Sequence, residues 1–211
     1  MIRTSSKLLA ALAFTLGLSA LGCESGGVGD PCIPEDEYRQ NFNGFASSEV
    51  NIESKSFQCE TRVCIVNHFQ GRVSCPYGQE ATDVDSLQPD DPGRCRIPGT
   101  PGTTTSSIDN SNIDEITVPV EPQLVERNAE NTVYCSCRCK GPDPNARYCE
   151  CPSGYECSEL VRELGLPGRA QLAGSYCVKA GTVYNPRGTL NPDTCNAERK
   201  QPGCGADGKN P

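Results

Sequence analysis

Fifteen cysteines are the residues of this sequence whose type and number most clearly indicate chemistry. Five of them lie within seventeen residues, at Cys135, Cys137, Cys139, Cys149 and Cys151. Cysteine thiols form disulfide bonds in an oxidising compartment, and as thiolates they bind soft metal ions such as Zn²⁺ or Cu(I). The choice between these two chemistries depends on the compartment and on how many cysteines are available for pairing.

The first 22 residues have the layout of an export signal. They carry two cations, Arg3 and Lys7, then an apolar run from Leu8 to Ala20, and no acidic residue. At about 1.5 Å per helical residue the run reaches only about 20 Å, short of the roughly 30 Å hydrocarbon core of a bilayer. Residues 1–22 are therefore predicted to be a signal peptide that directs the chain out of the cytoplasm.

The segment that ends this leader, Ser19–Cys23 (SALGC), resembles the lipobox of bacterial lipoproteins, with a small Gly22 at the cleavage position and Ala20 where many lipoboxes carry leucine. The resemblance implies that Cys23 becomes the N-terminus and carries a diacylglycerol thioether, normally with an acyl chain such as palmitate on its amino group. Two or more chains hold a protein stably on a membrane, because each buried methylene contributes about 0.8 kcal/mol. Glu24 replaces the aspartate that often retains such proteins on the inner membrane, which favours the outer membrane.

The parity of the cysteines agrees with a separate role for Cys23. Fifteen thiols cannot all pair within one chain, whereas the fourteen beyond Cys23 can pair without remainder. If an ordinary signal peptidase cut the leader elsewhere, Cys23 would be one more thiol. The cysteines predicted to form disulfides are Cys32, Cys59, Cys64, Cys75, Cys95, Cys135, Cys137, Cys139, Cys149, Cys151, Cys157, Cys177, Cys195 and Cys204.

The chain after the leader is poor in apolar residues. Leu, Ile, Val and Phe supply 31 of its 189 residues, whereas Gly and Pro supply 36, and such a composition alone is typical of a disordered chain. A disulfide restricts the unfolded chain and typically stabilises a fold by about 2 to 4 kcal/mol. The disulfides are therefore expected to replace an apolar core.

The cysteines divide the chain into two regions. Residues 23–31, rich in glycine, are interpreted as the lipid anchor and a flexible tether, and residues 96–131 as a linker or extended segment. The first cysteine-rich region, 32–95, holds five of the fourteen cysteines, and the second, 132–204, holds nine; a tail, 205–211, follows. Both counts are odd, so complete pairing requires at least one disulfide between the two regions.

The expected fold is a small, disulfide-rich one made mainly of short β-strands and loops. Alternating polar and apolar residues predict a strand at Glu49–Glu53. The segments Arg62–Val66 and Arg72–Cys75 predict a hairpin, which would place Cys64 and Cys75 on neighbouring strands.

Two further segments are expected to be extended. Glu115–Val125 is interrupted by Pro119 and Pro122, which favours an edge strand or a segment lying along the surface. Ser175–Tyr184 predicts a second hairpin, with its turn at Ala180–Gly181.

One short helix is predicted near residues 159–164. Ser158 can cap its N-terminus, and Gly165 with Pro167 would end it. A second short helix is predicted near Pro34–Gln40, which begins with proline and acidic residues.

The densest group of cysteines also constrains its own pairing. If the segment is extended, Cys135, Cys137 and Cys139 share one face, because side chains two apart in a strand point the same way. A disulfide within one C-x-C motif would close a strained ring. We therefore expect partners at Cys149, at Cys151 or at distant cysteines.

Three further resemblances concern the cysteines. Cys149–Cys157 (CECPSGYEC) is similar over about nine residues to the end of an epidermal-growth-factor-like module, and the whole chain resembles the cysteine-rich envelope lipoproteins of Gram-negative bacteria. The Cys135–Cys151 cluster also resembles metallothionein, which makes a soft-metal-binding envelope protein one alternative. The oxidising compartment, the even pairing count and the absence of a C-x-x-C motif favour disulfides instead.

An enzyme outside the cytoplasm is the other alternative. The single histidine, His68, falls at the tip of the expected 62–75 hairpin, where it would be the candidate base. The sequence has no G-x-S-x-G or H-E-x-x-H motif, no lysine-bearing phosphate loop, and no carboxylate cluster that matches an EF-hand.

These observations predict a lipid-anchored protein of the cell envelope, on the outer membrane, with a non-catalytic binding or structural role. Its expected contacts are the membrane, through Cys23, and another envelope protein or surface component, with no cofactor and no bound metal. Loss of the leader takes the formal net charge from −8 to −10, which makes nucleic acid a poor partner, and none is expected.

Overall fold

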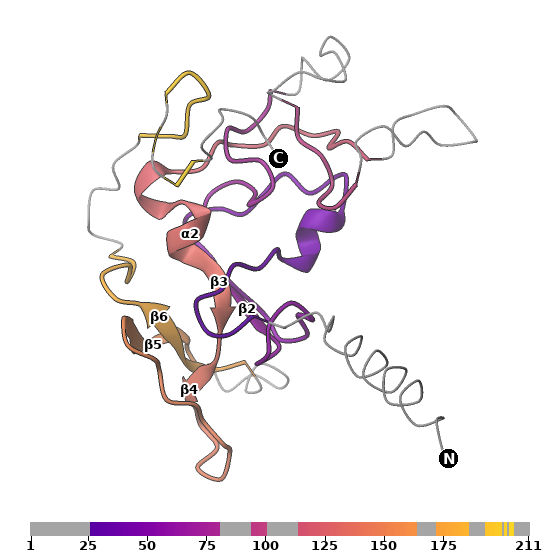
Figure 1. Cartoon of the computed structure of the whole chain (residues 1–211). Helices are drawn as coiled ribbons and strands as arrows, with labels where there is room; N and C mark the ends of the chain where they lie inside the picture. Colours follow the sequence, from indigo (N-terminus) through magenta and orange to yellow (C-terminus); the bar gives the residue numbers. More distant parts are fainter. Residues whose placement is uncertain are drawn as a thin grey trace, which may run out of the picture.

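The computed structural model confirms a small, disulfide-rich fold of short antiparallel strands. Two three-stranded sheets, loops and short helical turns make up the described part of the chain (Figure 1). The described residues are 26–80, 94–100, 114–163, 172–185, 193–199, 201 and 203–204.

The first sheet has the strand order β1–β2–β3. The central strand β2 (Val63–Asn67) pairs antiparallel with β1 (Val50–Glu53) on one side and with β3 (Val133–Ser136) on the other. Valine and isoleucine suit the pleated, buried surface of such a sheet. Cys64 lies opposite Cys135, so the register of β2 and β3 brings cysteines from both halves of the chain together.

The second sheet has the order β4–β6–β5. β6 (Gly174–Lys179) lies between β4 (Arg138–Lys140) and β5 (Tyr155–Val161), antiparallel to both. β3 and β4 are separated only by Cys137, so the chain passes from one sheet to the other at that residue.

Three short helical turns accompany the sheets in the part of the chain that the structure describes. They are η2 (Glu35–Tyr38), η4 (Val125–Arg127) and α2 (Ala129–Thr132). Asn128 is the N-cap residue of α2, and its side chain accepts a hydrogen bond from the N–H of Asn131. Within the described residues, no helix has the length and apolar character needed to cross a membrane.

The main core lies on and beside the first sheet. The buried side chains that pack together there are Cys32, Phe45, Cys59, Cys64, Val66, Phe69, Val133 and Cys135. Half of these residues are cysteines, so the disulfides supply core volume as well as cross-links. A second group, Ile65, Tyr134 and Tyr176, packs between the two sheets.

A buried polar network fixes η2 against the rest of the first region. The carboxylate of Glu37, which is fully buried, accepts hydrogen bonds from the N–H groups of Val73 and Ser74 and from the Ser74 hydroxyl. The Arg72 guanidinium, also buried, donates to the carbonyls of Glu37 and Phe42. Buried charges are tolerated when they are paired and hydrogen-bonded in this way. The network therefore sets the position of η2 and of the residue that ends it, Tyr38.

Two sequence-based expectations about the secondary structure are wrong. The prediction of a helix near 159–164 is wrong for residues 159–161, because Tyr155–Val161 forms β5. Leu164 lies outside the described residues. Cys157 lies opposite Cys177 in this strand, and pairing with β6 prevails over local helix propensity. The expected hairpin 62–75 is also wrong, because β2 pairs with β1 and β3 instead of with Arg72–Cys75.

The other expectations are confirmed, one of them only in part. A strand forms at Val50–Glu53 and a helical turn at Glu35–Tyr38, as predicted. Of the expected segment 115–125, residues 115–124 are extended and make isolated bridges to Gln79, Arg96 and Thr194, whereas Val125 begins η4. In 175–184 the strand and the turn are present, but no hairpin forms, because β6 pairs with the earlier strands β4 and β5.

A candidate binding groove beside the disulfide core

The structure pairs all fourteen cysteines that were predicted to form disulfides. The bonds are Cys32–Cys64, Cys59–Cys135, Cys75–Cys95, Cys137–Cys149, Cys139–Cys157, Cys151–Cys177 and Cys195–Cys204. Cys59–Cys135 is the bond expected between the two regions, and none of the bonds lies within one C-x-C motif, as predicted. Cys64 and Cys75, which the wrong hairpin would have placed side by side, belong to separate disulfides.

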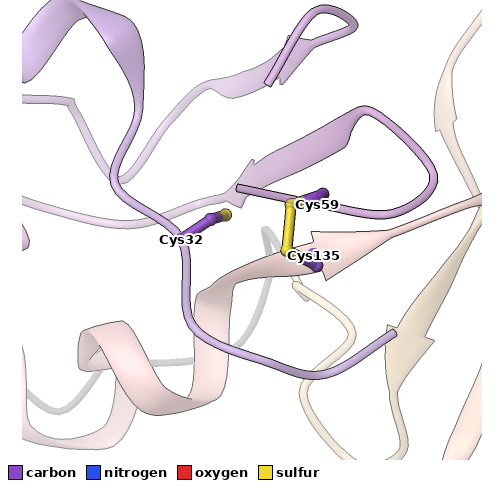
Figure 2. Close-up of side chains that lie close together, drawn as sticks. All are labelled: Cys32, Cys59 and Cys135. Carbon is purple, nitrogen blue, oxygen red and sulfur yellow. A yellow bond between two sulfur atoms is a disulfide. The ribbon is translucent and has the colours of Figure 1, made fainter. Parts of the chain in front are cut away.

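Two disulfides lie against each other in the core of the first sheet. Cys32 points toward the Cys59–Cys135 bond, and the three sulfur atoms lie within 4.8 Å of one another (Figure 2). All three residues are at most 1% exposed. The Cys32–Cys64 bond ties the segment that contains Cys32 to β2, and the Cys59–Cys135 bond ties the loop before β2 to β3.

A second group of sulfur atoms lies between the C-x-C segment and β6. The Sγ atom of Cys177 is 3.6 Å from that of Cys137 and 3.8 Å from that of Cys149. Each of these atoms belongs to a disulfide, and a disulfide offers no thiolate to a metal. Soft-metal binding by the Cys135–Cys151 cluster would therefore require reduction first.

The buried disulfide cluster supports the loop 54–62, which joins β1 to β2. The N–H of Gly26 donates to the carbonyl of Gln58 at 2.8 Å, and the N–H of Glu60 donates to the carbonyl of Gly26 at 2.9 Å. The Gln58 side chain donates to and accepts from the backbone of Ile33, at 2.8 and 3.0 Å. The chain from Gly26 onward is thus bound to the body of the protein, which differs from the flexible tether expected for 23–31.

Contacts within the loop fix its tip. The N–H of Ser56 donates to the carbonyl of Arg62, and the Thr61 hydroxyl donates to the carbonyl of Ser136 in β3. Arg62 has a positive φ of 63° and holds its guanidinium carbon 4.7 Å from the centre of the Phe57 ring. Phe57 is therefore presented to solvent by a loop with little freedom left to lose on binding.

A groove of about 730 Å³ lies between this loop and η2, and we call it the aromatic groove. Its walls include Ile33, Tyr38, Glu53, Phe57 and Arg62. Phe57 is 83% exposed and Tyr38 is 47% exposed, and they are two of the three large hydrophobic side chains exposed among the described residues. A protein this poor in apolar residues thus places two of them at one open surface.

The aromatic groove also has polar groups in its wall. Burial raises the pKa of Glu53, and the charges of Glu35 and Asp36 raise it further. The hydrogen bond that its carboxylate accepts from the Glu35 N–H, at 3.1 Å, lowers the pKa but does not cancel the rise. The buried Ser56 hydroxyl has no hydrogen-bond partner among the described residues. Histidine and cysteine are absent from the described lining, so aromatic and charged contacts dominate its chemistry.

His68, the candidate catalytic base, lies at the end of β2 away from the aromatic groove. Its ring stacks on Tyr184, with the ring centres 3.7 Å apart, and Nδ1 lies 3.0 Å from the carbonyl oxygen of Ser47. Burial lowers the pKa of His68, and the positive charge of Arg127 lowers it further. The Arg127 guanidinium donates to the carbonyls of His68 and Thr182, so this corner joins the first sheet to the segment after β6.

Sequence reasoning missed the aromatic groove altogether. The signal available was an isolated phenylalanine in the polar stretch SKSFQ, between a predicted strand and Cys59. Cys23 lies outside the described residues, so its lipidation stays a prediction. Comparisons with protein-family models, with curated proteins and with solved structures found no match.

Proposed function

We propose that this chain is a lipid-anchored, disulfide-stabilised protein of the bacterial cell envelope, on the outer membrane, with a non-catalytic binding role. The observation that carries the proposal is the pairing of the fourteen other cysteines, because it leaves Cys23 without a second cysteine in the chain to pair with. An unpaired cysteine directly after an export signal, in the sequence SALGC, is what lipid attachment requires. Seven disulfides fit an oxidising compartment.

The binding role is supported by the rigidity and exposure of the aromatic groove. Its loop is held by the Cys59–Cys135 disulfide and, one residue earlier in the chain, by the hydrogen bonds of Gln58 with Ile33. A surface ordered in this way loses little conformational entropy when it binds, and exposed aromatic rings contribute large contact areas. We therefore assign the contact with another envelope component to the aromatic groove.

Intact mass spectrometry of the protein extracted from the envelope tests the proposal. We expect an N-terminus at Cys23 with the mass of a diacylglyceryl group and an N-linked acyl chain, and a gain of fourteen hydrogens on reduction. A Cys23→Ser variant is the matched control: it should carry no lipid and still gain fourteen hydrogens. Wild-type protein without lipid would contradict the anchor. Thiols that react only after a chelator is added would favour soft-metal binding instead.

A further inference from the structure

The described chain begins beside the aromatic groove. Gly26 lies between the backbone groups of Gln58 and Glu60, to which it is hydrogen-bonded, and it also forms a β-bridge with Cys59. Phe57 directly precedes Gln58 in this loop and is the most exposed large hydrophobic side chain described. The N-terminal end of the described chain and the exposed ring therefore share one side of the molecule.

The proposed lipid on Cys23 would hold this side close to the membrane. Only two residues separate Cys23 from Gly26 in the sequence, and a fully extended chain covers at most about 3.5 Å per residue. Gly26 is thus within about 10 Å of the residue that carries the acyl chains, which is comparable to the depth of the headgroup layer on one face of a bilayer. With the tether this short, the loop cannot move far from the lipid surface.

We propose that the aromatic groove contacts the bilayer in which the chain is anchored, with Phe57 and Tyr38 inserted among zwitterionic phospholipid headgroups. This inference rests on the proposed lipidation of Cys23 and names the component that the groove binds. Tyrosine is favoured at the boundary between headgroups and hydrocarbon, and phenylalanine is common on the apolar face of segments that lie in that boundary. Phe57 at 83% exposure and Tyr38 at 47% are free to enter that layer without any rearrangement of the core.

The charges around the groove match a headgroup that carries both signs. Lys55 and Arg62 are exposed on the Phe57 loop and would face phosphate groups, whereas Glu35 and Glu53 would face ammonium groups. A strongly anionic surface is a poorer match, because the chain without its leader has a net charge of −10. The lipid anchor keeps the local concentration of headgroups high, so a contact that is weak by itself is sufficient.

The absence of tryptophan from the sequence allows a direct test. A Phe57→Trp variant of the full, lipidated chain is reconstituted into vesicles of zwitterionic phospholipid, with or without bromine on the acyl chains. We expect a blue-shifted emission that bromine reduces by about half, since an interfacial side chain reaches roughly 5–10 Å into the headgroup and acyl boundary. The matched control is Val183→Trp, because Val183 is 52% exposed and lines a cavity with Asn67 and His68, at the other end of β2. Its emission should be neither shifted nor quenched.

The remaining outcomes overturn the inference. Unshifted emission from the lipidated Phe57→Trp variant would show that the ring stays in water. A blue shift without bromine quenching would place the ring against protein or against the chain's own acyl groups. Quenching of the Val183→Trp control as strong as that of the Phe57→Trp variant would show that the molecule has no preferred side toward the membrane.

The mass of the reconstituted protein separates this inference from the proposed function. Lipid on Cys23 together with unquenched emission from the Phe57→Trp variant would contradict the inference and support the proposed lipid anchor. Absence of the lipid would contradict both the inference and the proposed function. A gain of fourteen hydrogens on reduction confirms that each variant has formed seven disulfides, as expected for substitutions at exposed positions.

Discussion

The two sheets use their disulfides differently. In the first sheet, every residue of β3 and four of the five residues of β2 are buried, and two disulfides pack among phenylalanine and valine side chains. In the second sheet, β4 and β5 have no buried residue, yet three disulfides cross-link its strands and the adjoining loop. Disulfides thus add to a core in one region and take its place in the other.

The second sheet depends on the first for most of its burial. Tyr176 of β6 packs against Ile65 and Tyr134 of the first sheet. The Tyr134 hydroxyl also accepts a hydrogen bond from the N–H of Lys179 at 2.7 Å. This arrangement leads us to expect global destabilisation when a disulfide of the first sheet is removed and a local effect when one of the second is removed.

The largest expected effect is that of the double variant Cys59→Ala, Cys135→Ala. This bond joins residues 76 apart, and loop-closure entropy predicts a loss of about 4 to 5 kcal/mol in the free energy of unfolding. Both cysteines are buried, so their truncation also leaves a cavity. Urea unfolding under non-reducing conditions, followed by circular dichroism, measures the loss.

The matched control for this variant is Cys195→Ala, Cys204→Ala, which removes a bond between residues only 9 apart. The same relation predicts a loss of about 2 to 3 kcal/mol. Equal losses in the two variants would contradict a special role for the bond between the regions.

A smaller and more local effect is expected for Cys139→Ala, Cys157→Ala. This variant removes a bond between residues 18 apart, and the same relation predicts a loss of about 3 kcal/mol in the free energy of unfolding. The strand that loses its cross-link, β5, has no buried residue, so we expect the loss to be local. Hydrogen exchange measured by mass spectrometry should rise in 155–161 and stay unchanged in 63–67. Exchange that rises equally in both segments would show that the two sheets unfold as one unit, and the comparison between them would fail.

The sequence could predict features that depend on neighbouring residues or on the number of cysteines, but not the pairing of distant strands. The number of disulfides and the bond between the regions follow from cysteine parity, and the strand at Val50–Glu53 follows from local alternation. The partner of β2 was not predictable in this way, because β3 lies about seventy residues further along the chain. Residues 159–161 were misassigned for a similar reason, since their helix-like pattern carries no information about pairing with β6.

The candidate site could not be predicted from the sequence, because it too depends on contacts between distant parts of the chain. Tyr38 and Phe57 are far apart in the chain, and they line one groove only because a buried Glu37–Arg72 network holds η2 and the disulfide cluster holds the loop. Neither support can be derived from residue types alone. What the sequence does contain is the exposed phenylalanine itself, in a stretch where nothing else is apolar.

The smallest effect is expected at the corner where the two regions meet, and it depends on pH. The pKa of His68 in the folded protein is lowered by burial and by Arg127, so the unfolded chain binds more protons as the pH falls below about 6.5. The contribution of His68 to stability is therefore fully present above that pH, is lost as the pH falls through the lowered pKa, and is constant below it. We expect this contribution to be less than about 1 kcal/mol, because the ring is partly exposed and is screened by water.

A His68→Asn variant isolates this contribution, because asparagine tolerates the positive φ of 51° at this position. The free energies of unfolding of both proteins are measured from pH 7.5 to 5, where the carboxylates common to both cancel in the difference. The difference in the free energy of unfolding between the wild type and the variant should become smaller as the pH falls, because only the wild type loses the contribution of neutral His68. A difference that is constant with pH would show that the ring acts only by stacking on Tyr184, and that the junction between the two regions is insensitive to protonation.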